Sequence, residues 1–146
     1  MATEAFSSAL TSYCFRLHPG VDLKIELLRY AQAHQLQAAT VLSAVGSLTV
    51  ANLRLANATQ TALFRGPLEI VSLIGTLNQD GGHFHISVAD GDGKVVGGHL
   101  MDGCQIHTTG EIVLLESVDL QFRREIDTTT GFRELTIANR PMKSVK

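Results

Sequence analysis

One stretch, from Leu68 to Leu115, constrains the fold more than any other part of the 146-residue chain. It alternates apolar, strand-like runs with glycine-rich turns, and it reads LEIVSLIGTLNQDGGHFHISVADGDGKVVGGHLMDGCQIHTTGEIVLL. Glycine and aspartate accept the dihedral angles of tight turns, so such a pattern is typical of antiparallel strands joined by hairpins. The stretch also holds four of the six histidines, which makes it the first place to look for chemistry.

Three of these histidines can be argued onto one face of one hairpin. His83 and His85 are two residues apart in a strand-like run, so their side chains point the same way. If Ala89 opposes Val95 across the turn, the loop has five residues and His99 lies opposite His85, with the three imidazoles roughly 5 to 8 Å apart. A turn of two or four residues would place His99 on the other face. The sequence leaves this parity open.

The rest of the chain predicts further strands and one principal helix. Asp22 is a suitable N-cap for a helix through Leu36, because apolar residues recur there at helical spacing. The segments expected as strands are residues 12–17, 38–45 and 48–55 joined at Gly46-Ser47, 64–77, 105–115, 118–124 and 133–138. The prediction is an α+β fold: a single domain with one mostly antiparallel β-sheet and one principal helix.

Composition and charge exclude several classes of protein. With 45% hydrophobic and 18% charged residues, the chain is expected to fold, and 146 residues suit one domain. A net charge of -2 gives no global basic field that would attract nucleic acid or a membrane surface. We see no signal peptide, no membrane-spanning run and no metal or redox spacing of Cys14 and Cys104, so we expect a soluble cytoplasmic protein.

The motifs of the chain resemble those of a known family. The chain is similar to the plants-and-prokaryotes-conserved domain, abbreviated PPC or PCC, over nearly its whole length. We therefore expect the domain to cover residues 8–140, followed by a basic, flexible tail at 141–146. The motifs that carry the resemblance are Val45-Gly46-Ser47-Leu48, Gly66-Pro67-Leu68-Glu69-Ile70-Val71-Ser72-Leu73, Gly75-Thr76-Leu77, His83-Phe84-His85-Ile86-Ser87, Gly97-Gly98-His99-Leu100, Gly103-Cys104 and Thr108-Thr109.

The resemblance implies a homotrimer built on a central antiparallel sheet. In plants the domain is coupled to AT-hook segments in nuclear DNA-binding proteins, and bacterial members are often labelled DNA-binding by that analogy. In the plant proteins, one segment is associated with contacts to other transcription proteins. The matching residues here, predicted by resemblance to contact partners, are Gly66, Pro67, Leu68, Glu69, Ile70 and Val71. Arg65-Gly66-Pro67 echoes an AT-hook core but lacks flanking basic residues.

The histidines resemble those of bacterial members and not the plant domain. Three converging imidazoles without a ligand would crowd hydrogen-bond donors, whereas three neutral imidazoles suit a borderline divalent ion. We therefore predict that His83, His85 and His99 bind a divalent metal, with zinc as the first choice. Glu69 is a weaker candidate, as a general base, as a residue that orients a histidine, or as a trimer contact.

Three functions remain open. The first is a trimeric regulatory protein with a metal site, binding other proteins and DNA as the family label suggests; this is the one we adopt. The second is a zinc-dependent, hydrolase-like enzyme that uses a metal-bound water. The third is a module that senses a metal or a small ligand. The absence of a basic stripe argues against tight binding to duplex DNA, which depends on neutralising phosphates.

Overall fold

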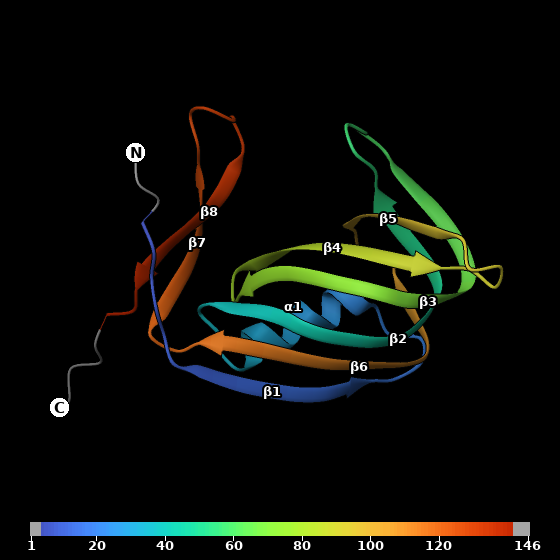
Figure 1. Ribbon diagram of the computed structural model, residues 1–146, viewed down its shortest axis with the longest axis horizontal. Helices are drawn as coiled ribbons and strands as arrows, with labels where there is room; N and C mark the ends of the chain where they lie inside the picture. Colours follow the sequence, from blue (N-terminus) through green and yellow to red (C-terminus); the bar gives the residue numbers. More distant parts are fainter. Residues whose placement is uncertain (1–3, 142–146) are drawn as a thin grey trace.

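The computed structural model describes residues 4–141, which form eight strands and one α-helix. Six strands make an antiparallel sheet in the order β1-β6-β2-β3-β4-β5, and β7 pairs with β8 in a separate two-stranded sheet (Figure 1). The predicted α+β class is therefore confirmed. The elements are β1 (Leu10–Leu17), α1 (Leu23–Ala33), β2 (Ala39–Arg54), β3 (Thr61–Asn78), β4 (Gly81–Ala89), β5 (Val95–Leu100), β6 (Gln105–Ser117), β7 (Leu120–Ile126) and β8 (Arg133–Asn139).

The edge strand β5 returns to β2, which closes four strands into a ring of pairings. Leu53 and Arg54 at the end of β2 pair with Leu100 and His99 of β5. This approach requires glycine at position 98, because a Cβ there would lie 2.8 Å from the Arg54 carbonyl oxygen. The ring places β2, β4 and β5 side by side where the histidines lie.

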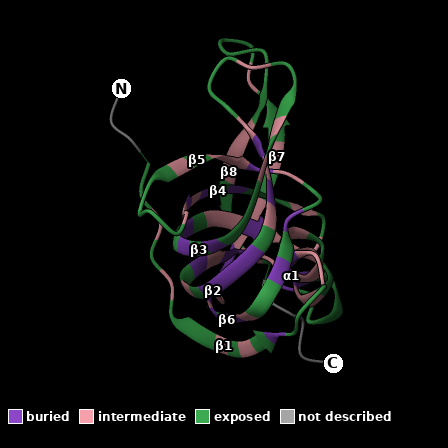
Figure 2. Cartoon of the chain, turned by 90° about the vertical axis from the view of Figure 1, so that its right-hand side faces the viewer, coloured by how far each residue is buried: buried purple, intermediate pink, exposed green. Residues whose placement is uncertain are grey.

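The core lies between the inner face of the curved sheet and α1. Asp22 caps the helix as predicted, its side chain accepting a hydrogen bond from the Ile25 backbone N–H at 2.9 Å. On the helix, Leu23, Leu27 and Ala31 are fully buried. Figure 2 shows the buried residues gathered along β2, β3 and α1, while the far end of the β7–β8 hairpin is largely exposed.

The helix ends earlier than predicted. It stops at Ala33, because Gln35 takes a left-handed conformation (φ 53°) and the Leu36 N–H donates to the Ala31 carbonyl oxygen at 2.9 Å. Such a return to an earlier carbonyl satisfies the end of a helix and turns the chain away from its axis. Leu36 is still buried, so its apolar character reflects the core and not a further helical turn.

The predicted break between two strands at Gly46-Ser47 is wrong. Residues 39–54 form one continuous strand, β2, that pairs with β3 on one side and β6 on the other. A Cβ at Gly46 would overlap the Thr109 carbonyl oxygen, so this glycine allows a close approach of two backbones and not a turn. Register shifts against β6 on either side of Gly46 absorb the irregularity.

The prediction of one sheet also needs correction at the C-terminal end. Strands β7 and β8 form their own hairpin, which rises from the body at the left of Figure 1. A polar turn at 127–131 joins the two strands, with the Gly131 N–H donating to the Asp127 carbonyl oxygen at 2.7 Å. Of the predicted basic tail, residues 142–146 lie outside the described part of the chain. Within residues 4–141, no helix has the length and apolarity to cross a membrane.

Candidate metal centre

The turn between β4 and β5 has the odd length that brings the three histidines together. Ala89 pairs with Val95 and His85 pairs with His99, so the loop spans five residues. Asp90 organises this loop, because its side chain accepts hydrogen bonds from the backbone N–H groups of Asp92 and Lys94 at 3.0 and 2.9 Å. The parity that the sequence left open is thereby set, and His99 lies on the face of His85.

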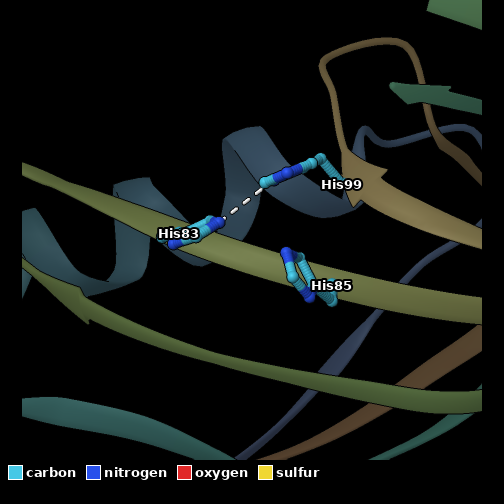
Figure 3. A group of neighbouring side chains, drawn as sticks. All are labelled: His83, His85 and His99. Carbon is cyan, nitrogen blue, oxygen red and sulfur yellow. Dashed lines mark hydrogen bonds between the residues drawn. The ribbon is translucent and has the colours of Figure 1, made fainter. Parts of the chain in front are cut away.

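The three imidazoles converge on the outer face of the hairpin (Figure 3). Each offers one ring nitrogen, and these nitrogens lie within 4.8 Å of one another. The His83 Nε2 and His99 Nδ1 atoms are already 3.0 Å apart. Two nitrogens on a tetrahedral zinc ion are about 3.3 Å apart, so small side-chain adjustments would bring all three within coordinating distance of one ion. The donor set therefore fits zinc.

The site also favours the form of histidine that binds metal. Desolvation is the main cause that lowers the pKa of both His83 and His99 below the ordinary value. Nearby positive charge adds to it, chiefly from Arg124 for His83 and from Arg54 for His99. A lowered pKa keeps an imidazole neutral at physiological pH, and only the neutral ring has a lone pair free for a cation.

Two arginines are positioned beside the histidines by the strand register. Arg54 is the cross-strand partner of His99, so both face the same side of the sheet. Thr76 is the partner of His83, and its hydroxyl accepts a hydrogen bond from the Arg124 guanidinium at 3.0 Å. The two guanidinium groups thus reach the triad from different directions, one from β2 and one from β7.

Two of the three histidines, His83 and His99, form part of the floor of an open groove of about 880 Å³. One wall is the turn between β2 and β3, and the other is the β7–β8 hairpin, the two arms that rise from the body in Figure 1. The groove is lined by Arg54, Ala56, Asn57, Ala58, Thr59, Gly82, His83, His99, Arg124, Phe132, Arg133 and Glu134. A ligand in this groove would contact the histidines and the arginines together.

Other candidates from the sequence lie elsewhere. Glu69 is exposed and pairs with Ala89, four residues beyond His85 and roughly 13 Å away along the strand. Its segment lies in β3, where Leu68 and Ile70 are buried in the core, whereas Gly66, Pro67, Glu69 and Val71 are exposed. Within one subunit, the structure therefore does not bring Glu69 to the triad.

Cys104 and Asp102 are engaged in structural contacts. Burial raises the pKa of the Cys104 thiol to about 11, and its sulfur accepts a hydrogen bond from the Asn52 backbone N–H at 3.1 Å. Such a thiol stays protonated and is a poor metal ligand. Asp102 forms an ion pair with Lys24 at 2.8 Å.

Sequence reasoning missed the arginines that flank the triad. Arg124 lines the groove, whereas the neighbouring Arg123 guanidinium donates a hydrogen bond to the Gln121 side chain at 3.0 Å. Arg54 carried no local signal, because its place beside His99 depends on β5 returning to β2. The pair Gly97-Gly98 is the one feature of the sequence that marks this close approach.

The protein is thus an α+β domain with an antiparallel sheet that carries a cluster of three histidines on its outer face. The model of the Plants and Prokaryotes Conserved (PCC) domain matches residues 4–118. The chain belongs to the PCC domain family, as its motifs predicted.

Known relatives support the fold and show the domain in a larger context. The chain is 51% identical over 131 residues to the "Bifunctional protein GlmU" of a Synechococcus strain, covering 90% of this chain and 21% of that protein. It spans about a fifth of the length of the curated relatives that it matches. A hypothetical protein from Salmonella cholerae-suis has a TM-score of 0.92 and 38% identity, over 94% of this chain and 100% of the other.

Two further solved structures share the fold of this chain. A metal-containing protein from Archaeoglobus fulgidus has a TM-score of 0.75 and 25% identity, over 93% of this chain and 99% of the other. A candidate DNA-binding protein from Bacteroides thetaiotaomicron has a TM-score of 0.74 and 18% identity, over 90% of this chain and 98% of the other. At that identity the second likeness supports the fold alone.

Proposed function

We propose that this PCC-domain protein binds one divalent metal ion per subunit, zinc by preference, through His83, His85 and His99. The observation that carries the proposal is the convergence of three ring nitrogens within 4.8 Å on one hairpin. Three neutral imidazoles are an established zinc donor set, and they leave one coordination position open. The metal-containing relative from Archaeoglobus fulgidus supports the same assignment.

The direct test is the metal content of the purified protein. We expect one zinc per subunit in the natural chain and none in the His85→Ala variant. The matched control is His107→Ala, which removes an exposed histidine of β6 outside the cluster and should keep full occupancy. Equal zinc content in all three proteins would refute the assignment.

We further propose that the protein is a homotrimer that uses the outer face of β2 and β3. Four large apolar side chains there are more than half exposed: Leu42, Val45, Val71 and Ile74. Leu42 and Val45 come from β2, and Val71 and Ile74 from the adjacent strand β3. An exposed apolar patch of this kind is typical of an interface.

The trimer has a simple test by light scattering. Ile74→Glu places a charge in the patch and should yield monomers at micromolar concentration, because a buried unpaired charge is costly. Ile126→Glu changes an equally exposed isoleucine of β7 and should leave the assembly intact. A natural chain that is already monomeric would contradict the proposal.

A role in gene regulation, with residues 66–71 contacting protein partners, remains the family-based proposal for the cellular function. It does not require tight DNA binding by the domain alone. The net charge is -2, and we expect weak or undetectable binding to duplex DNA at physiological salt in an anisotropy measurement. Tight, sequence-dependent binding by this chain would overturn that expectation.

A zinc-dependent enzyme is the second candidate, favoured by the groove that opens beside the triad. Zinc supplies Lewis acidity and lowers the pKa of a water that it binds. Among the groove residues, Glu134 has the one carboxylate, and it accepts a hydrogen bond from the Thr130 hydroxyl at 3.1 Å. Glu134 is therefore a better placed acid or base than Glu69 within one subunit.

A further inference from the structure

We propose that the groove beside the three histidines binds a small organic dianion, whose carboxylate or phosphate oxygens are held by Arg54 and Arg124. This inference rests in part on the proposed metal site, because the oxygens of the dianion would also face the open coordination position of the metal and bind more tightly with the metal present. It goes further in naming the chemical class of ligand and the residues that recognise it.

The side chains that line the groove carry an excess of positive charge. Three guanidinium groups line the groove, those of Arg54, Arg124 and Arg133, against the single carboxylate of Glu134. Between residues 4 and 141, the ion pairs are Lys24–Asp102, Arg29–Glu26 and Arg140–Glu116, so none of the three groove arginines is paired with a carboxylate. With a divalent cation on neutral histidines, the groove would carry a strong excess of positive charge. An anion with two or more charges would offset it.

The two arginines are also placed so that both can reach one ligand beside the histidines. Arg54 and Arg124 are half-buried; the strand register places Arg54 beside His99, and a hydrogen bond to Thr76 holds the Arg124 guanidinium near His83. An arginine held in place loses less entropy when it binds, and its planar fork matches the paired oxygens of a carboxylate or a phosphate. Among residues 4–141, the guanidinium of Arg124 donates one hydrogen bond, to the Thr76 hydroxyl. Its remaining N–H donors are free for a ligand.

The groove also offers apolar surface for the organic part of a ligand. Phe132, at the tip of the β7–β8 hairpin, lines the groove and is 72% exposed. On the opposite wall, Ala56 and Ala58 offer small apolar surfaces. A bare inorganic anion would leave these surfaces unused, whereas a small organic molecule would cover them and gain from their burial.

The wall that carries Phe132 and Arg124 lies outside the part of the chain that the PCC domain model matches. The PCC match ends at residue 118, and the hairpin begins at Leu120. The histidines therefore come from the family domain, whereas half of the anion-binding residues come from the hairpin that follows it. Ligand preference should accordingly vary among relatives with the sequence of this hairpin.

The test is calorimetric titration of the zinc-loaded, full-length protein with three probes: inorganic phosphate, succinate and glycerol 3-phosphate. We expect an organic dianion to bind more tightly than inorganic phosphate. Arg54→Ala and Arg124→Gln should each weaken binding about tenfold to a hundredfold, the usual effect of removing one charge-assisted contact. Arg65→Ala, which removes an exposed arginine of β3 outside the groove, should change nothing.

Zinc content measured on the same samples separates the two proposals. Both arginine variants should keep one zinc per subunit, and a metal-free His85→Ala variant should still bind the dianion, only more weakly. Full zinc occupancy with no binding of any probe, or with binding unaffected by Arg54→Ala and Arg124→Gln, would overturn the anion site alone. Binding of a DNA duplex through these arginines, with no binding of the small dianions, would overturn it as well.

Discussion

The two faces of β4 differ completely although their residues alternate along one strand. On the inner face, Phe84, Ile86 and Val88 are at most 2% exposed and form part of the core. On the outer face, His83 and His85 are exposed and make no core contact. The inner face therefore specifies the fold, and the outer face is free to carry chemistry. Substitutions on the two faces should have separable effects.

The largest expected effect is on the inner face. Phe84→Ala should lower the free energy of unfolding by about 3 to 5 kcal/mol, because it leaves a cavity in a close-packed core. His85→Ala, one residue away, should change it by no more than about 0.5 kcal/mol in the metal-free protein, as exposed substitutions usually do. Urea unfolding at one fixed protein concentration measures both. Similar losses in the two variants would contradict the separation of the faces.

The next effect belongs to the outer face. Zinc at a hundredfold excess over its dissociation constant should stabilise the folded protein by about 2.7 kcal/mol, since the unfolded chain lacks the assembled site. His85→Ala should abolish this gain. Phe84→Ala should keep most of it, provided that the variant folds. Thermal unfolding of the three proteins, each with zinc and with a chelator, measures the zinc-dependent gain in stability, and a gain that survives in His85→Ala would place the metal elsewhere.

Much of this contrast could be predicted from the sequence, because it depends on local rules. The alternation around His83 and His85 indicates two faces with a period of two, and Asp22 indicates the start of the helix. The sequence did not decide the turn parity, since Asp90 would suit turns of several lengths. The pairing of Ala89 with Val95 shows that the loop spans five residues, and the hydrogen bonds from the Asp92 and Lys94 backbone N–H groups to the Asp90 side chain stabilise that length.

Longer-range features could not be read in the same way. Gly46 looked like a turn, because nothing local shows that Thr109 of another strand lies against it. Arg54 and His99 are 45 positions apart and meet only because β5 returns to β2. Arg124 reaches the site from a hairpin whose separate sheet was not expected. The shared face of His83 and His85 could thus be predicted from the sequence, whereas the positions of Arg54 and Arg124 beside them could not.

A smaller effect, on the outer face alone, concerns pH. The lowered pKa values of His83 and His99 mean that the unfolded chain, with ordinary histidines near pH 6.5, binds protons first as the pH falls. Because the unfolded state then holds more protons, stability should fall as the pH drops from about 7 through the lowered values. Zinc should be released over the same range, since protonated imidazoles cannot bind it.

This pH effect can be isolated with a double variant. Replacing His83 and His99 by Ala removes the two titrating groups, so the metal-free variant should lose less stability between pH 7 and pH 5 than the natural chain does. Thermal unfolding across that range measures the difference. Identical pH profiles would show that the histidines of this face do not govern the response.

The most direct test of zinc binding by His83, His85 and His99 is a zinc X-ray absorption measurement on the purified, zinc-loaded protein, together with its zinc-to-protein ratio. The account predicts one zinc per subunit with three imidazole nitrogens at about 2.0 to 2.1 Å and one further light-atom ligand. It also predicts that this signature disappears in His99→Ala, the residue placed at the site by the five-residue turn. A zinc signal with sulfur ligands, or one that is unchanged in His99→Ala, would contradict it.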